Sequence, residues 1–383
     1  MKRVKGKRLM NFKSIKKLCE VEKAFDFSEE NKTLFKKAMI ENYKFQYNNQ
    51  NYIKYLANRN NFNIDKLNIL DEVENIPTLF VGTMKISEFC NFEKKDLAAV
   101  FTSSGTNGQK TQSFFDKESL ERLETLSYNI FKEIGFTSDI PVHYFLFSYD
   151  ISKANNVGTS WSDNQILKLA PSKSVNWMIE WDEDKKEFVF DSEKWARVFV
   201  ELSREAPVRL LGFPAFMYKM MEDIKRLYGK IKIYPESFVI AGGGWKNHLG
   251  KAMGLKEFID YMEDCIGIRR ENIRDTYGMA EHGIPYCSCK EGHLHVPIFS
   301  EIIARNPITL EKVDYGQEGL LQLLTPYNVA QPNLSILSTD LVVIDKDCTC
   351  GLKGDFIKSI RRGGIKKHKG CAINAQDVLN KSS

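Results

Sequence analysis

The stretch that most constrains the fold is residues 101–112, which read FTSSGTNGQKTQ and follow the apolar run at 97–100. Its hydroxyl side chains, glycines and lysine lie close together: Thr102, Ser103, Ser104, Gly105, Thr106, Gly108 and Lys110. Glycines let backbone N–H groups turn inward, hydroxyls donate to phosphate oxygens, and a lysine adds a mobile positive charge. The stretch predicts a strand followed by a phosphate-binding loop, with a plain polar hairpin as the alternative. It is not a Walker loop, because no Gly–Lys pair occurs in it.

Composition excludes several classes of protein. The 383 residues are 43% hydrophobic and 27% charged, which suits a large folded core and not a disordered chain. The net charge of +5 is modest, and no basic stripe with interleaved aromatic residues indicates a nucleic-acid surface. We find no signal peptide and no run of about 18 apolar residues, so we expect a cytoplasmic protein without a membrane span. The eight cysteines then predict thiols or metal ligands and not disulfides.

Strands and glycine turns alternate along the chain. Apolar residues at helical spacing predict several short helices within residues 1–75. Beyond them, strands are predicted at 79–81, 111–115, 142–147, 208–211 and 237–241, and a helix capped by Asp116 at 117–134. This succession predicts an α/β fold in which helices cover a sheet. Ligands bind at the carboxyl ends of such strands, where the glycine loop and a triple glycine at 242–244 lie.

Two further motifs suit a nucleotide. Gly242, Gly243 and Gly244 lack side chains, so a flat heterocycle can lie against the backbone. The segment 274–283 reads RDTYGMAEHG, in which a tyrosine can stack on a purine and a glutamate is a natural ligand of Mg²⁺. Taken alone, each motif also fits an ordinary turn.

The order of these motifs resembles a known superfamily. TSSGTNGQK, AGGGW, YGMAE and a late STD at 338–340 look like the adenylate-forming enzymes, which activate carboxylic acids as acyl-AMP. Within them the chain is similar to the acyl-protein synthetases of the LuxE type, the fatty-acid ligases of bioluminescence operons. The resemblance covers residues 75–371 and implies a large N-terminal domain of helix-flanked sheets with a very short C-terminal region. We therefore expect a helical preface at 1–75, an adenylate-forming core at 76–355 and a mobile basic tail at 356–383.

The resemblance also implies roles for individual residues. Residues from Thr102 to Lys110 would hold the phosphates of ATP, and Gly242, Gly243 and Gly244 with Tyr277 and Gly278 would hold adenine. Glu281 would bind Mg²⁺, Asp340 would take the ribose hydroxyls, and Lys110 and Glu281 would act in catalysis. The family ends in a Gly–Arg pair with a Gly–Cys pair nine residues after the arginine, and this chain has Arg362 and Cys371 at that spacing. Arg361 stands where the glycine belongs, which leaves the choice of phosphate-contacting arginine open.

Cys371 also has the surroundings of a reactive thiol. Lys366, Lys367, His368 and Lys369 precede it, and nearby cations lower a thiol pKa. Glycines at 363, 364 and 370 let the segment swing toward a cleft. The resemblance implies that Cys371 takes the acyl group as a thioester and passes it to an acceptor protein such as a reductase. A cysteine without function on a frayed tail is the alternative.

Six cysteine and histidine residues form a second constellation, and they are Cys287, Cys289, His293, His295, Cys348 and Cys350. Thiolates and imidazole on tight turns suit a structural, tetrahedral Zn²⁺. Ligases similar to the phenylacetate-CoA ligases carry a comparable arrangement. We favour Cys289, His295, Cys348 and Cys350 as the ligands, with Cys287 as the substitute for Cys289. A metal-free pair of cysteine hairpins is the alternative.

The sequence thus predicts an enzyme that uses ATP and Mg²⁺ to turn a carboxylic acid, by resemblance a fatty acid, into acyl-AMP. The acyl group would then move to Cys371 and on to a protein. One alternative is a ligase of the phenylacetate-CoA-ligase type, which delivers the acyl group to coenzyme A. Another, from a different class, is a zinc-stabilised ATP-binding subunit that scaffolds a partner. The sequence does not name the acid.

Overall fold

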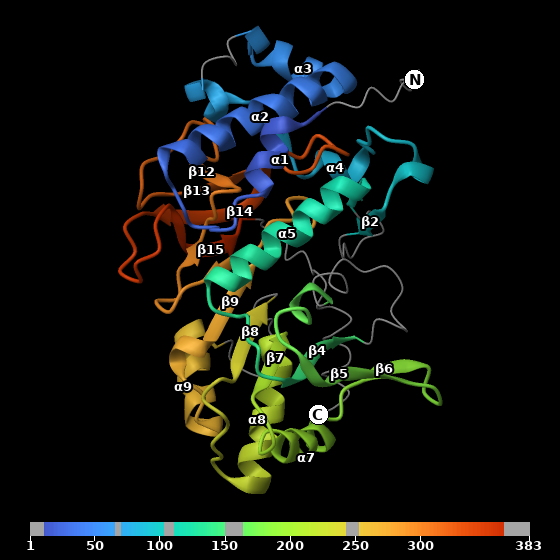
Figure 1. The fold of residues 1–383 in the computed structure, drawn as a ribbon, viewed down its shortest axis with the longest axis vertical. Coiled ribbons are helices and arrows are strands. Elements are labelled where there is room, and N and C mark those ends of the chain that lie inside the picture. Colours follow the sequence, from blue (N-terminus) through green and yellow to red (C-terminus); the bar gives the residue numbers. More distant parts are fainter. Residues whose placement is uncertain (1–10, 66–69, 103–110, 150–163, 243–252, 364–383) are drawn as a thin grey trace.

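The computed structural model describes residues 11–65, 70–102, 111–149, 164–242 and 253–363. One 13-stranded mixed sheet runs through it, and its lower half in Figure 1 is parallel. The parallel order is β5-β4-β7-β8-β9, with β6 antiparallel beside β5. These strands are β4 (Val142–Tyr149), β5 (Ser172–Asp182), β6 (Glu187–Val189), β7 (Val208–Gly212), β8 (Phe238–Gly242) and β9 (Ile273–Tyr277). Because β4 is buried on both faces, its sequence is a continuous apolar run and does not alternate.

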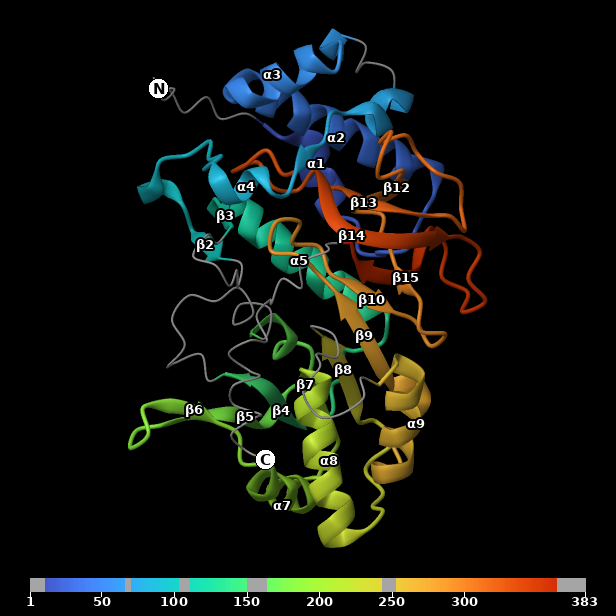
Figure 2. The ribbon, with the colours of Figure 1, turned by 180° about the vertical axis from the view of Figure 1, so that it is seen from behind.

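Helices cover both faces of this parallel part. Alternate residues of the strands face opposite sides, so Tyr144 and Leu146 join one core while Phe145 and Phe147 join another. The first core includes residues of α5 (Lys117–Glu133), and the second includes residues of α7 (Ser192–Leu202), α8 (Pro214–Tyr228) and α9 (Leu255–Ile266). Figures 1 and 2 show α7, α8 and α9 around the parallel strands, with α5 crossing toward the upper half.

The upper half of the sheet is antiparallel, apart from β1, which pairs in parallel with β14. Its order is β12-β13-β14-β15-β11-β10, and β10 joins β9 of the parallel part. These strands are β1 (Leu79–Phe80), β10 (Tyr286–Ser288), β11 (Leu294–His295), β12 (Glu301–Arg305), β13 (Glu318–Leu324), β14 (Ser335–Asp345) and β15 (Phe356–Arg362). A separate two-stranded sheet pairs β2 (Ala99–Thr102) with β3 (Gln112–Phe115).

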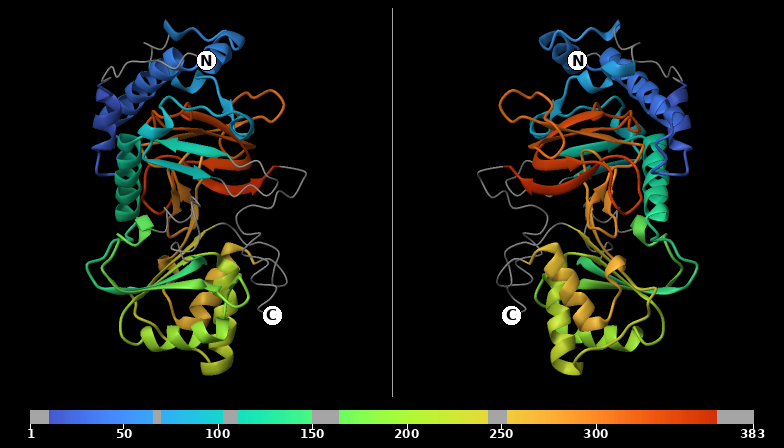
Figure 3. Two further views of the ribbon diagram at one scale, coloured as in Figure 1. Left: turned by 90° about the vertical axis from the view of Figure 1, so that its right-hand side faces the viewer. Right: turned by 90° about the vertical axis from the view of Figure 1, so that its left-hand side faces the viewer.

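The N-terminal helices lie against the upper half, as Figure 3 shows. They are α1 (Lys13–Cys19), α2 (Glu29–Asn49), α3 (Asn51–Arg59) and α4 (Thr83–Ile86). Short 3₁₀ turns lie at Leu70–Asn75 and Lys94–Asp96, and another, at Arg270–Asn272, precedes β9. Ser28 caps α2 by accepting a hydrogen bond from the Asn31 backbone N–H at 3.4 Å. Buried residues of α1 and α2, among them Leu18 and Met39, belong to the same core as β13 and β14. The divisions at 75 and 355 remain predictions.

The α/β prediction is confirmed, and strands form where the apolar runs predicted them. Two details differ from the sequence expectations. Asp116 stands at the N-cap of α5, but its side chain forms no capping hydrogen bond. Residues 356–362, expected in a tail, form β15, because Phe356 and Ile357 are buried while the strand pairs with β14 and β11.

The first testable prediction concerns Glu301, at the start of β12. Burial, together with Glu74 and Asp355 nearby, raises the pKa of its carboxyl to about 7. The native state therefore holds this proton more tightly than the unfolded chain, and stability falls as pH rises from about 4.5 to about 7. Glu301→Gln should stabilise the protein at pH 8 by roughly 1–2 kcal/mol and change little at pH 4.5. Urea unfolding at both pH values measures this.

Glu311→Gln is the matched control, because Glu311 is exposed beyond the end of β12. It should leave stability unchanged at both pH values. An equal effect of Glu301→Gln at pH 4.5 and pH 8 would contradict the assignment of the raised pKa to this carboxyl.

Candidate active site

Three parallel strands end next to one another at Gly212, Gly242 and Tyr277. Gly212 pairs in register with Ala241, and Gly242 pairs with Thr276. Gly212 has φ +119°, and a Cβ there would lie 2.7 Å from the backbone oxygen of Phe147, so only glycine fits. The register brings Gly242 and Tyr277, predicted from separate motifs, to one edge of the sheet.

Tyr277 contacts Asp340 of β14, in the antiparallel half of the sheet. Its hydroxyl donates a hydrogen bond to Oδ2 of Asp340 at 2.8 Å, and its ring stacks on Tyr286 at 6.2 Å between centroids. Burial, the Asp340 carboxylate and more distantly Glu281 hold the pKa of Tyr277 well above its ordinary value. The phenol therefore stays neutral and donates. Tyr277 and Asp340, placed in the site by resemblance, lie in direct contact.

The two arginines of β15 differ in their surroundings. Arg362 pairs in register with Asp340, so these residues lie on the same face of the antiparallel pair β14 and β15. Arg361 pairs with Leu341, and its guanidinium makes an ion pair with Glu318 in which Nε donates to Oε2 at 2.7 Å. Arg361 is thus held on β13, whereas Arg362 neighbours the aspartate of the STD motif.

The turn that carries Glu281 is fixed by its backbone. The Gly283 N–H donates to the Met279 carbonyl at 2.8 Å, and Gly283 has φ +86°. A Cβ at Gly283 would lie 2.0 Å from the Tyr327 hydroxyl, so the position admits only glycine. The Asn333 side chain donates to the Glu281 carbonyl at 2.7 Å. The Glu281 residue is therefore buried in a set position, within electrostatic reach of Tyr277.

The hairpin of β2 and β3 leads into the predicted phosphate loop. Thr102 ends β2 opposite Gln112 of β3. Ser103, Ser104, Gly105, Thr106, Gly108 and Lys110 lie outside the described residues, as do Gly243, Gly244 and Cys371. Gly278 is described, and apart from its own chain neighbours no described residue has an atom within 4 Å of where its Cβ would be. The structure therefore describes the two strands on either side of the loop, β2 and β3.

Sequence reasoning missed the segment that supports this site, residues 325–333. Asn328 donates to the Phe114 carbonyl at 3.1 Å, and Gln331 accepts from the Phe114 N–H at 3.1 Å, so both backbone groups of this β3 residue are bound by the segment. Asn42 of α2 donates to the Asn328 carbonyl at 2.8 Å. Together with Asn333, these amides join α2, the glycine-loop hairpin and the Glu281 turn. Amide residues interspersed with prolines just before the STD motif were the available signal.

Four of the six cysteine and histidine candidates lie close together in the structure. Side-chain ligand atoms of Cys289, His295, Cys348 and Cys350 all lie within 4.8 Å of one another. Sγ of Cys289 and Sγ of Cys348 are 3.8 Å apart, and Sγ of Cys350 is 3.3 Å from Nε2 of His295. These are the four residues favoured from the sequence.

The two remaining candidates are not members of this group of four. Cys287 packs in the main core, where burial raises the pKa of its thiol strongly. His293 Nδ1 lies 3.3 Å from Sγ of Cys348, and its ring stacks on Phe356 at 4.5 Å between centroids. Cys287 is therefore not part of the cluster, and His293 adjoins it.

The donor set of the cluster suits a metal ion. Burial raises the pKa of Cys350 to about 12 and lowers that of His295 to about 4, so desolvation opposes charge on both side chains. A divalent cation bound between them would favour thiolates and neutral imidazole. Three sulfurs and one nitrogen at these separations fit tetrahedral Zn²⁺. Phe25 packs edge-on against His295 at 6.0 Å, so the cluster also contacts the N-terminal region.

Comparison with known proteins identifies the family. The model of the acyl-protein synthetase family LuxE matches residues 2–380. The chain belongs to this family. It is accordingly an adenylate-forming ligase, and the resemblance seen in the motifs is confirmed.

Two bacterial relatives of this LuxE-family chain share most of its length. It is 26% identical over 360 residues to the long-chain-fatty-acid–luciferin-component ligase of Aliivibrio fischeri, covering 92% of this chain and 91% of that one. It is 23% identical over 353 residues to the ligase of the same name from Vibrio harveyi, covering 92% of this chain and 89% of that one.

Solved structures share its fold. A 2-hydroxyisobutyryl-CoA ligase in complex with 2-HIB-AMP and CoA aligns with a TM-score of 0.67 at 15% identity, covering 89% of this chain and 70% of that one. An open conformation of that ligase aligns with a TM-score of 0.64 at 13% identity, covering 86% and 69%. The fold is therefore that of the adenylate-forming ligases. No helix within the described residues is both long and apolar enough to cross a membrane.

Proposed function

We propose that this chain activates a long-chain fatty acid with Mg-ATP and then carries the acyl group as a thioester on Cys371. A carboxylate oxygen of the acid attacks the α-phosphorus of ATP, and pyrophosphate leaves. The Cys371 thiolate next attacks the acyl carbonyl carbon, and AMP leaves. The acyl group finally passes from sulfur to a nucleophile on an acceptor protein. The fatty acid is proposed from the names of the two bacterial ligases.

The observation that supports the nucleotide site best is the contact between Tyr277 and Asp340 at the carboxyl edge of β9. Asp340 is partly exposed there and has a carboxylate oxygen that can accept from ribose hydroxyls. Arg362, its cross-strand neighbour, supplies a cation for the α-phosphate side. We assign adenine to Gly242, Gly243, Gly244, Tyr277 and Gly278.

The other charged residues of the proposed site, Lys110 and Glu281, are assigned to the triphosphate and its metal. We assign the triphosphate oxygens to the loop from Thr102 to Lys110, which β2 and β3 present from one end. Glu281 is the carboxylate held in a set position near Tyr277, and it suits a Mg²⁺ ligand. Mg²⁺, when bound, neutralises charge on the phosphates and so lessens their repulsion of the incoming carboxylate. We also propose that Cys289, His295, Cys348 and Cys350 hold one structural Zn²⁺.

The test of this site is acid-dependent ATP–pyrophosphate exchange in single variants. Lys110→Ala and Glu281→Gln should each slow exchange by at least about tenfold, because each removes a charge that acts on the triphosphate or its metal. Arg362→Ala should also slow exchange. Circular dichroism should show that all three variants stay folded.

Arg361→Ala is the matched control for Arg362→Ala. It removes a neighbouring guanidinium of the same strand, but one that is paired with Glu318. It should leave exchange near the wild-type rate. Wild-type exchange in Lys110→Ala and Glu281→Gln would refute the assignment of the nucleotide site.

A further inference from the structure

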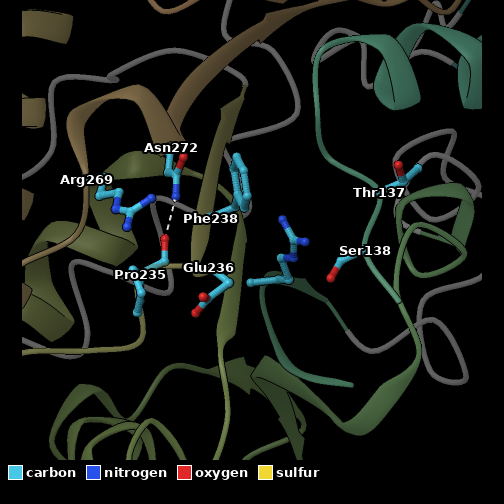
Figure 4. Close-up of a pocket in the computed structure, with 8 residues that line it drawn as sticks. Thr137, Ser138, Pro235, Glu236, Phe238, Arg269 and Asn272 are labelled. Carbon is cyan, nitrogen blue, oxygen red and sulfur yellow. Dashed lines mark hydrogen bonds between the residues drawn. The ribbon is translucent and has the colours of Figure 1, made fainter. Parts of the chain in front are cut away.

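A hollow of about 250 Å³, drawn in Figure 4, is lined by residues at the amino ends of β7 and β8. The candidate active site lies at the carboxyl ends of the same strands. The lining of the hollow comes from the segments that enter β7, β8 and β9 and from the segment after α5: Thr137, Ser138, Arg209, Pro235, Glu236, Phe238, Arg269 and Asn272. Phe238 begins β8, and Gly242 at the end of that strand belongs to the candidate active site. At roughly 3.3 Å per strand residue, about 13 Å of strand separates the two.

Arg209 is the notable side chain of this hollow. It is only 4% exposed, and its Nε and Nη1 atoms are buried without a hydrogen-bond partner. Its guanidinium carbon lies over the Phe238 ring at 4.4 Å from the centroid. That contact holds the guanidinium plane but leaves the N–H groups of Nε and Nη1 without an acceptor. No carboxylate among the described residues forms an ion pair with it.

Burying the Arg209 guanidinium without a partner of opposite charge costs folding free energy. Desolvation by burial lowers the pKa of Arg209 to about 10. A buried charge that has no partner of opposite charge destabilises the folded protein. The Arg209 guanidinium lies on the Phe238 ring, and two of its nitrogens have no acceptor. A bound anion would supply the missing negative charge.

The other lining groups favour an anion that has several oxygens. Arg269 adds a second guanidinium, exposed at the rim. Thr137 and Ser138 bring hydroxyl groups from the opposite side of the hollow, as Figure 4 shows. Glu236 is the acidic lining residue, and because it is exposed, water screens its charge. Guanidinium and hydroxyl donors on two sides of the hollow can bind several oxygens of one phosphate group.

A second hollow of about 640 Å³ shares Thr137 and Ser138 with the first. Its lining combines apolar residues such as Leu169 and Pro171 with Lys132 and Lys168. The organic part of a ligand whose phosphate contacts Arg209 can therefore extend past the two hydroxyls into this space.

We infer that Arg209, Arg269, Thr137 and Ser138 form a binding site for the phosphate group of a small phosphate monoester, distinct from the nucleotide site. Arg209 donates to the phosphate oxygens from the sheet side, and the two hydroxyls donate from across the hollow. The bound anion compensates the buried charge and stabilises the amino ends of the same strands whose carboxyl ends form the candidate active site.

Inorganic phosphate is the probe for this site. Isothermal titration in chloride buffer should show saturable phosphate binding to the wild-type protein, with a matching rise in Tm. In Arg209→Gln the affinity should fall by at least about tenfold, since charge-assisted hydrogen bonds are lost. Arg269→Ala, at the exposed rim, should weaken binding less. Phosphate also stabilises proteins by exclusion from their surface, and the Tm response of Arg209→Gln measures that part.

Lys110→Ala separates this site from the phosphate loop of the proposed active site. It should keep the wild-type phosphate affinity, whereas Arg209→Gln should keep acid-dependent ATP–pyrophosphate exchange. If Arg209→Gln fails to fold, Arg209→Lys serves in its place, because it keeps the charge but loses the planar fork and should still weaken binding. Absence of saturable binding to the wild-type protein, its loss in Lys110→Ala, or equal affinity for acetate would each overturn the proposal.

Discussion

Cys371→Ser is expected to abolish acyl labelling of the protein while ATP–pyrophosphate exchange continues at the wild-type rate. A serine hydroxyl is too weakly ionised near neutral pH to replace a thiolate. Exchange survives because adenylation precedes transfer and uses the separate loop at 102–110. Incubation with ATP and a radiolabelled fatty acid measures the label, and neutral hydroxylamine should release it from the wild-type protein because thioesters are cleaved by this reagent.

Two controls sharpen this experiment. Cys90→Ser should keep the full label, because Cys90 precedes the predicted core motifs and its thiol donates to the Phe92 carbonyl at 3.3 Å. Replacing Lys366, Lys367 and Lys369 together by alanine should slow labelling and move its pH optimum upward, because nearby cations lower a thiol pKa. Label on Cys371→Ser, or acylation of added coenzyme A alone, would instead favour the coenzyme A ligase.

Cys350→Ser is expected to release zinc and to lower Tm by on the order of 5–10 °C, because a structural Zn²⁺ contributes directly to folding. The cluster joins the turn at 348–351 to β11 and contacts Phe25 near the N-terminus, so its loss loosens both regions. Elemental analysis of protein purified without chelators should give about one zinc per wild-type chain.

Cys265→Ser provides the comparison for the zinc prediction. Cys265 is a buried cysteine of α9 that packs in a different core from the cluster, with its thiol donating to the Met221 carbonyl at 3.4 Å. It should keep the metal even where it changes stability. Wild-type protein free of zinc, or Cys350→Ser with a full complement, would contradict the assignment of the metal site.

Much of the fold could be predicted from the sequence, because buried strands and helices have recognisable spacings of apolar residues. The apolar run at 142–147 predicted a buried strand, and it is β4. Gly242 ends β8 and Tyr277 ends β9, two neighbouring parallel strands, as expected from the sequence, whereas Thr102 ends β2 of the separate two-stranded sheet. Family resemblance added Asp340, and the register of β14 and β15 then placed Arg362 opposite it.

Other features depend on contacts between segments distant in sequence. The amides at 328, 331 and 333 look like loop residues until Asn42 and Phe114 are placed beside them. The difference between Arg361 and Arg362 rests on Glu318, more than forty residues away. The unpartnered state of Arg209 is likewise invisible in the sequence, because Phe238 and the strand ends that bury it come from separate segments.

Acid-dependent ATP–pyrophosphate exchange by the wild-type protein tests the proposed function most directly. Radiolabelled pyrophosphate should enter ATP rapidly when a long-chain fatty acid and Mg²⁺ are present, and only at background rate when the acid is left out. Aryl acids, tested in parallel, should support slower exchange than the fatty acid. Exchange that depends on no acid of either class would contradict adenylation and leave the ATP-binding scaffold as the better description.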